Sequence, residues 1–179
     1  VVAVERDPDL PAVLADTLHP WRDRFALIEK DALDLVAADM AAPWPNKLVS
    51  NLPYAVAATV VLDYFQQFPF VDSATVMVQK EVADRVAAER GTKNHGAYTV
   101  KLGLYAEPAG RFTVGPGNFF PPPRVDSAVI RLNRRVPLMA DGSPASPAVI
   151  AAAGLMADAA FANRRTTLAQ AVERYQEHD

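Results

Sequence analysis

The sequence of 179 residues contains no cysteine, few histidines and no long apolar run. Without cysteine the chain can form neither disulfides nor cysteine-ligated zinc sites, and it cannot use a thiol nucleophile. No apolar stretch reaches the length of about 18 residues that a transmembrane helix needs. The three histidines, His19, His95 and His178, share no ligand spacing, so we read them as surface residues and expect no metal site.

The sequence also lacks a starting methionine and a basic leader followed by an apolar core. Its first residues, Val1-Val2-Ala3-Val4, read as the middle of a strand. Nothing in them indicates secretion, and we therefore expect a cytoplasmic protein. This beginning also predicts that the chain is a piece of a longer protein.

Charge is distributed unevenly along a chain whose net charge is −3. Residues 101–135 set two carboxylates, Glu107 and Asp126, against six cations: Lys101, Arg111, Arg124, Arg131, Arg134 and Arg135. An acidic chain is not expected to bind nucleic acid through bulk electrostatics. A local basic face is enough for an enzyme that holds RNA around its site, although a solvated surface of uneven charge explains the same pattern.

Short β-branched runs alternate with stretches of helical spacing. Strands are predicted at residues 1–4, 25–29, 47–50, 73–79, 111–114 and 125–132. Helices are predicted from Asp7 as N-cap and Pro8 as first helical residue up to His19, and at 55–68, 80–90 and 98–105. This alternation predicts an α/β fold with a largely parallel sheet. The last two strands have no helix between them, which predicts an antiparallel hairpin at one edge.

The composition changes after Arg135. Residues 137–147 are linker-like, and two alanine-rich helices without strands are predicted at 147–161 and 166–175. The sequence therefore predicts two domains, an α/β domain at residues 1–135 and part of a small helical domain at residues 136–179.

Carboxylates follow the first two predicted strands. Glu5 comes after the first strand and Asp31 after the second. Ligands of parallel α/β sheets bind at the carboxyl ends of the strands, where an acidic residue can accept hydrogen bonds from ribose hydroxyls. Either residue alone is more often a helix cap or a turn residue. Together, at successive strand ends, they indicate a nucleoside site, with Glu5 at the ribose and Asp31 at the adenine amino group.

The third predicted strand runs into Asn51-Leu52-Pro53-Tyr54. Asn and Pro are common in turns, and a simple turn is the structural alternative. The functional interpretation is that the Asn51 side-chain oxygen and the Leu52 carbonyl accept the two hydrogens of an exocyclic amine. Pro53 would fix the turn, and Tyr54 would offer a face on which a base stacks.

These residues belong to a set of motifs in which the sequence resembles the ribosomal RNA adenine N6-dimethyltransferases of the KsgA type. The matching stretches run in family order over nearly the whole chain: Val4-Glu5-Arg6-Asp7, Asp31-Ala32-Leu33, Asn51-Leu52-Pro53-Tyr54, Val78-Gln79-Lys80-Glu81-Val82-Ala83-Asp84-Arg85, residues 119–129 (FFPPPRVDSAV) and residues 161–168 (FANRRTTL). The Gln-Lys-Glu-Val-Ala-Asp-Arg and Pro-Pro-Pro-Arg-Val-Asp-Ser runs are highly specific.

The resemblance implies a Rossmann-like methyltransferase that uses S-adenosylmethionine, with no metal. It assigns cofactor binding to five residues: Glu5, Arg6, Asp31, Ala32 and Asn51. It assigns the methyl-transfer site to Asn51, Leu52, Pro53, Tyr54 and Phe119. We expect RNA contacts by Arg124, Arg164 and Arg165, although a solvated helix face explains Arg164 and Arg165 equally well. The resemblance implies a monomer that acts on small-subunit (16S) ribosomal RNA in the 30S subunit, dimethylating adjacent adenosines during ribosome biogenesis.

The sequence departs from this family at several positions. The family's central strand and Gly-rich cofactor loop belong before Val1 and are absent from the sequence. Lys30 stands where the family usually has Gly, Ala55 where it usually has Asn, and His95 where it has Tyr. Three alternatives stay open: a DNA adenine methyltransferase, a large-subunit ribosomal RNA resistance methylase, and a non-enzymatic RNA-binding relative in ribosome assembly or transcription.

Overall fold

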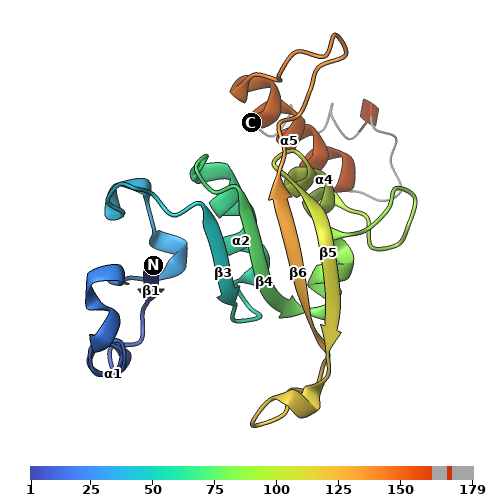
Figure 1. Ribbon diagram of the computed structural model, residues 1–179. Helices are drawn as coiled ribbons and strands as arrows, with labels where there is room; N and C mark the ends of the chain where they lie inside the picture. The colour runs from blue at the N-terminus through green and yellow to red at the C-terminus, as the bar shows by residue number, and fades with distance from the viewer. Residues whose placement is uncertain (163–168, 171–179) are drawn as a thin grey trace.

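The computed structural model describes residues 1–162 and 169–170, in which strands and helices alternate along the chain (Figure 1). Within those residues, no helix combines the length and the apolar character needed to cross a bilayer. The predicted helix at 166–175 and the residues Arg164 and Arg165 fall largely or wholly outside the described part of the chain.

The N-terminal unit is a parallel pair of short strands, β1 (Val2–Glu5) and β2 (Ala26–Glu29), joined by α1 (Leu10–Thr17) and the 3-10 helix η1 (His19–Arg24). The predicted start of α1 is wrong by two residues. Asp9, not Asp7, is the N-cap, and Pro11 rather than Pro8 lies in the first turn. The Asp7 carboxylate instead accepts a hydrogen bond from the Asp9 amide at 3.0 Å, which holds a local turn before the helix.

The larger sheet has four strands in the order β3-β4-β6-β5. Its strands are β3 (Lys47–Asn51), β4 (Ser73–Gln79), β6 (Ser127–Arg134) and β5 (Ala106–Val114). β3 and β4 are parallel, whereas β6 is antiparallel to both of its neighbours. The predicted antiparallel hairpin at one edge is confirmed, with β5 as the edge strand.

The strands are less parallel than predicted, whereas the gap between them is what the resemblance leads us to expect from the absence of the family's central strand. Half of the observed strand pairings are antiparallel, and no described strand joins β1 to β3, so the strands form two sheets (Figure 1). The break falls between the two parallel pairs. An apolar groove lies there, lined by side chains that include Val2, Val4, Leu48, Tyr64 and Phe68. The resemblance to the methyltransferases leads us to expect a central strand in this part of the sheet.

Helices α2 (Ala57–Gln67), α3 (Lys80–Val86), α4 (Ala97–Gly103) and α5 (Pro147–Ala162) follow the strands in sequence. In Figure 1, α2, α4 and α5 lie behind one face of the four-stranded sheet. Buried side chains from α2 and from alternate positions of β4 and β6 form the core against this face, among them Val60, Phe65, Val76, Ile130 and Leu132. Val49 and Phe112, in contrast, are 77% and 63% exposed.

The structure corrects two predicted element bounds. α3 ends at Val86, whereas helical spacing predicted a helix up to Arg90. β5 begins at Ala106, five residues before its predicted start, because residues 106–110 pair with β6 although Pro108 and Gly110 favour a turn locally. Its pairing with β6 shifts register between Pro108 and Gly110. An edge strand tolerates proline at such a bulge, because the missing amide donor faces away from the ladder.

Helix α5 is attached to α4 by an ion pair. The Lys101 ammonium lies 2.9 Å from the Asp158 carboxylate. Three short 3-10 helices complete the described elements: η2 (Ala32–Asp34), η3 (Ala37–Asp39) and η4 (Pro116–Asn118).

Arg134, at the end of β6, binds the C-terminal region of α2. Its guanidinium donates to the carbonyls of Phe65, Phe68 and Val71 at 3.0, 2.7 and 2.6 Å. The guanidinium carbon also lies 5.1 Å from the centre of the Phe65 ring. A guanidinium can reach three carbonyls at once, whereas an ammonium is a more compact group without the planar fork.

We expect Arg134→Lys to lower the free energy of unfolding by about 1.5–3 kcal/mol, because at least one charge-assisted hydrogen bond to a helix carbonyl is lost. Chemical denaturation measures this difference. Arg135→Lys is the matched control, since Arg135 is the exposed neighbour on the same segment. Equal stability of the two variants would contradict the assignment.

Candidate methyl-transfer site

The predicted site residues lie at the carboxyl ends of successive parallel strands. Glu5 is the last residue of β1, Asp31 lies two residues beyond β2, and Asn51 is the last residue of β3. The register of β1 with β2 sets Glu5 beside Glu29, and the Lys30 amide donates to the Glu5 carbonyl at 3.0 Å. These ends are where open α/β sheets bind their ligands.

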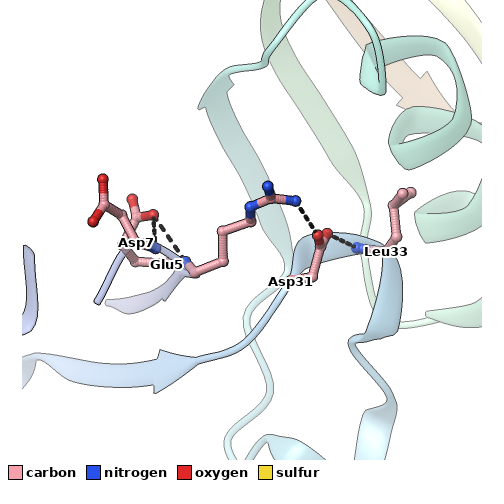
Figure 2. Close-up of polar contacts among 5 residues, drawn as sticks. Glu5, Asp7, Asp31 and Leu33 are labelled. Carbon is pink, nitrogen blue, oxygen red and sulfur yellow. Dashed lines mark hydrogen bonds and ion pairs between the residues drawn. The ribbon is translucent and has the colours of Figure 1, made fainter. Parts of the chain in front are cut away.

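The Glu5 side chain turns back onto the backbone that follows it. Its Oε1 accepts hydrogen bonds from the amides of Arg6 and Asp7, both at 2.8 Å (Figure 2). Two backbone donors fix the carboxylate in one orientation. Oε2 accepts no hydrogen bond from any other residue within the described ranges, so it has capacity for an external donor.

Asp31 is the N-cap of η2, and both of its carboxylate oxygens have partners. Oδ1 accepts from the Leu33 amide at 3.0 Å, and Oδ2 accepts from Arg6 Nη1 at 2.6 Å. The Leu33 hydrogen bond and the Arg6 guanidinium lower the pKa of Asp31, so the carboxylate is ionised at neutral pH. Arg6 directly follows Glu5 in the chain, and its guanidinium reaches the carboxylate at the end of the neighbouring strand. Arg6 therefore links the predicted ribose and adenine partners.

Ala32, the residue after Asp31, is held to helix α2. The Tyr64 hydroxyl donates to the Ala32 carbonyl at 3.1 Å. Burial raises the pKa of Tyr64 to about 12, with a further contribution from the nearby Asp31 charge. The phenol thus stays protonated and can donate throughout the physiological range. This contact fixes the loop after β2 against the core.

The Asn51-Leu52-Pro53-Tyr54 segment connects β3 to α2. The Leu52 amide donates to the Met77 carbonyl at 3.1 Å, which ties the segment to the end of β4. The Pro53 carbonyl accepts from the amides of Val56 and Ala57, both at 3.1 Å, and so begins the turn into α2. Leu52 is 6% exposed and anchors the segment in the core.

The two atoms proposed to accept the amine hydrogens are available. Asn51 is exposed. Within residues 1–162 and 169–170, neither its side-chain oxygen nor the Leu52 carbonyl accepts a hydrogen bond from another residue. A segment that served only as a turn would be expected to use the Asn side chain to close it. The geometry thus leaves both acceptors free at the strand end.

Tyr54 is connected to a residue that sequence reasoning did not assign. Its hydroxyl lies 2.7 Å from the Ser127 hydroxyl, and either can donate. Ser127 is the first residue of β6 and is completely buried. The only signal for it in the sequence is its place at the end of the Pro-Pro-Pro-Arg-Val-Asp-Ser run.

Phe119 lies in the loop that precedes β6. Its amide donates to the Pro116 carbonyl at 3.1 Å and its side chain is half-buried, whereas Phe120 is fully exposed. Among the described residues, no ring contact joins Phe119 to Tyr54. Arg124 is exposed in the same loop. The structure thus places Phe119 in the loop between β5 and β6, without a described contact to Tyr54.

Contacts made by helix α3, which follows β4, explain part of the Gln-Lys-Glu-Val-Ala-Asp-Arg motif. Asp84 lies 2.7 Å from Lys80 on its own helix and 2.7 Å from Arg111 on β5. The Lys80 amide donates to the Asp126 carbonyl at 2.9 Å. The motif therefore attaches α3 to both strands of the hairpin, beside the methyl-transfer segment. No group of three or more metal-ligating side chains occurs in the described part of the chain.

The Asp84 network makes a pH-dependent contribution to stability. The hydrogen bond from Lys80, followed by that from Arg111, lowers the pKa of Asp84 below its ordinary 3.8. A carboxylate whose pKa is lowered by folding stabilises the fold above its unfolded pKa, and this contribution is lost as the pH falls. We expect Asp84→Asn to lower the free energy of unfolding by about 1–3 kcal/mol at neutral pH.

Denaturation at neutral pH and at about pH 3 measures this effect, because the difference from the wild type should shrink in acid. Glu81→Gln is the matched control, since Glu81 is 76% exposed and its one ion pair within the described residues is with Arg85 on the same helix. A difference between Asp84→Asn and wild type that persisted unchanged in acid would contradict the assignment.

The chain matches a known protein family and is similar in sequence to several of its members. The model of a family described as "Ribosomal RNA adenine dimethylase" matches residues 1–177. Ribosomal RNA small subunit methyltransferase A of Streptomyces griseus is 43% identical over 176 residues, which cover 96% of this chain and 58% of that protein. The protein of the same name from Corynebacterium jeikeium is 43% identical over 140 residues, covering 75% of this chain and 44% of that protein. The chain spans at most about three fifths of these relatives.

Two solved structures share the fold. A dimethyladenosine transferase from Plasmodium falciparum superposes with a TM-score of 0.73 at 21% identity, covering 97% of this chain and 59% of that one. The 23S rRNA methyltransferase ErmE superposes with a TM-score of 0.70 at 24% identity, covering 97% of this chain and 66% of that one. These similarities confirm the Rossmann-like methyltransferase fold expected from the sequence.

Proposed function

Because this chain belongs to the ribosomal RNA adenine dimethylase family, we propose that the protein transfers methyl groups from S-adenosylmethionine to N6 of adenine in small-subunit ribosomal RNA. The observation that carries the proposal is the Asn51-Leu52-Pro53-Tyr54 segment, whose two free acceptors lie at the end of β3. The names of its relatives favour the small subunit, and adjacent adenosines would be dimethylated during ribosome biogenesis.

The carboxylates at the ends of β1 and β2 fit a nucleoside cofactor. Two backbone amides donate to Glu5 Oε1 and so fix the orientation of the carboxylate. Its other oxygen, Oε2, has no partner among the described residues. Asp31 is ionised, and a carboxylate oxygen can accept a second hydrogen bond. Glu5 would bind the ribose hydroxyls and Asp31 the adenine amino group, with Arg6 and Ala32 shaping the site between them. Asn51 would contact both cofactor and target.

The chemistry is a displacement at the methyl carbon. S-adenosylmethionine supplies a methyl group on a positively charged sulfur. The lone pair of adenine N6 is delocalised into the ring, so it is a poor nucleophile. Asn51 Oδ1 and the Leu52 carbonyl would accept the two N6 hydrogens, localise the lone pair and stabilise the positive charge that develops on nitrogen. The proton then leaves to water, so no dedicated base and no metal are needed.

RNA binding is proposed to surround this site. Tyr54 would stack on the target base once it has left its helix, and Phe119 would close the pocket from another side. Arg124, exposed in the loop before β6, would contact phosphate. We propose the same role for Arg164 and Arg165. The protein would act as a cytoplasmic monomer on the 30S subunit.

The test is to supply the full-length protein with cofactor labelled in the methyl group and to offer unmethylated small subunits, large subunits and DNA separately. We expect label in small-subunit RNA. Label in large-subunit RNA would favour a resistance methylase, and label in DNA a DNA methyltransferase. Stable subunit binding without label would favour the non-enzymatic alternative. Each of these three results would overturn the proposal.

A further inference from the structure

Ser127 is the one polar side chain among the described residues that is buried. Its hydroxyl lies 2.7 Å from the Tyr54 hydroxyl, and the two residues are 73 positions apart in the sequence. A buried hydroxyl without a partner is costly, so this contact is the one that satisfies Ser127. Tyr54 itself is only half-buried. The hydrogen bond therefore joins a rigid residue to a partly exposed ring.

The backbone around Ser127 is fixed from both sides. In the sheet register Ser127 pairs with Gln79 of β4 and with Val114 of β5. One residue earlier, the Asp126 carbonyl accepts a hydrogen bond from the Lys80 amide at 2.9 Å. Ser127 therefore has little freedom to follow a movement of Tyr54.

Tyr54 lies in the segment that connects β3 to α2. The Leu52 amide is bonded to the Met77 carbonyl, and the Pro53 carbonyl starts α2. The Tyr54 ring is held at its tip, where the phenol meets Ser127. An aromatic side chain has two rotatable bonds, and fixing its tip leaves the ring plane in one orientation. A ring already held in its bound orientation loses less entropy when a base stacks on it.

We infer that Ser127 is a positioning residue for methyl transfer, whose hydroxyl holds the Tyr54 ring in the orientation in which it receives the target adenine. This inference rests on the proposed function and deepens it. Ser127 does not touch the substrate. It acts through Tyr54 alone, across the end of β4. The inference thus gives a role to the last residue of the Pro-Pro-Pro-Arg-Val-Asp-Ser run.

The test is a mutant cycle read by single-turnover methylation of small subunits with the full-length protein. Removing the hydrogen bond by Ser127→Ala or by Tyr54→Phe should slow the reaction about twofold to tenfold, the effect of one hydrogen bond. In a Tyr54→Ala background, Ser127→Ala should produce no further loss, because the ring that it positions is gone. An equal loss from Ser127→Ala in both backgrounds would overturn the inference, as would no loss in the wild-type background.

Tyr98→Phe is the matched control. The Tyr98 hydroxyl donates to the Ala58 carbonyl at 2.9 Å, and burial raises its pKa. Its loss also removes a tyrosine hydrogen bond, but one that involves neither Tyr54 nor Ser127. We expect lower stability with an unchanged single-turnover rate. A slowing equal to that of Ser127→Ala would show a general effect of destabilisation and would overturn the inference.

A second measurement keeps the inference separate from the proposed function. Aromatic NMR of labelled Tyr54 reports the order of its ring without any methyl transfer. Ser127→Ala should increase the motion of this ring, and Tyr98→Phe should not. A Tyr54 ring as ordered in Ser127→Ala as in wild type would overturn the inference. An inactive wild type would overturn the proposed function alone.

Discussion

Replacing Asn51 by alanine is expected to slow methyl transfer about a hundredfold to a thousandfold, while cofactor affinity changes little. The Asn51 oxygen is free of other described partners, and it would meet the amine most strongly when positive charge develops on N6. An interaction made mainly in the transition state affects turnover rather than binding. Loss of one such preorganised contact typically costs about 2.7–4 kcal/mol.

Single-turnover kinetics on small subunits, together with calorimetry of cofactor binding, measure the two effects separately. Asn46→Ala is the matched control. Asn46 lies just before β3, at its opposite end, where its side chain donates to Asp72 at 3.1 Å. We expect this variant to methylate at the wild-type rate. Near-normal turnover by Asn51→Ala would reduce Asn51 to a turn residue and favour the non-enzymatic alternative.

Replacing Glu5 by alanine is expected to weaken cofactor binding about tenfold to 150-fold. The variant removes a charged acceptor that two backbone amides hold in place, and a charge-assisted hydrogen bond contributes roughly 1.5–3 kcal/mol. Calorimetry with the full-length protein measures the change. Glu107→Ala removes an exposed carboxylate from β5, the edge strand of the other sheet, and should leave the affinity unchanged.

An unchanged affinity in Glu5→Ala, with the fold preserved, would show that the Glu5 carboxylate serves only the turn after β1. Accepting hydrogen bonds from the amides of Arg6 and Asp7 would then be the sole role of this carboxylate. Circular dichroism and the unfolding midpoint establish whether the variant is folded.

The sequence predicted local structure best where one short segment carries the whole signal. The Asn51 to Tyr54 segment combines a strand end, a turn and a helix start, and the structure has all three in order. Glu5 and Asp31 were likewise predicted at neighbouring strand ends, because parallel strands that follow one another place their carboxyl ends together. The direct Arg6–Asp31 ion pair was not predicted, since its geometry depends on two turns.

Other features were out of reach because they depend on residues distant in sequence. The Tyr54–Ser127 hydrogen bond needs the strand order β3-β4-β6, which spacing alone does not give. The early start of β5 was missed because Pro108 and Gly110 indicate a turn locally, whereas pairing with β6 makes them an edge strand.

The most direct test of the central claim is the chemical identity of the product that depends on Asn51. Small-subunit RNA is incubated with the full-length protein and S-adenosylmethionine, digested to nucleosides and analysed by mass spectrometry. The account predicts adenosine carrying two methyl groups on N6 with the wild type and a greatly reduced yield with Asn51→Ala. A methyl group on any other atom, or an undiminished yield with Asn51→Ala, would contradict it.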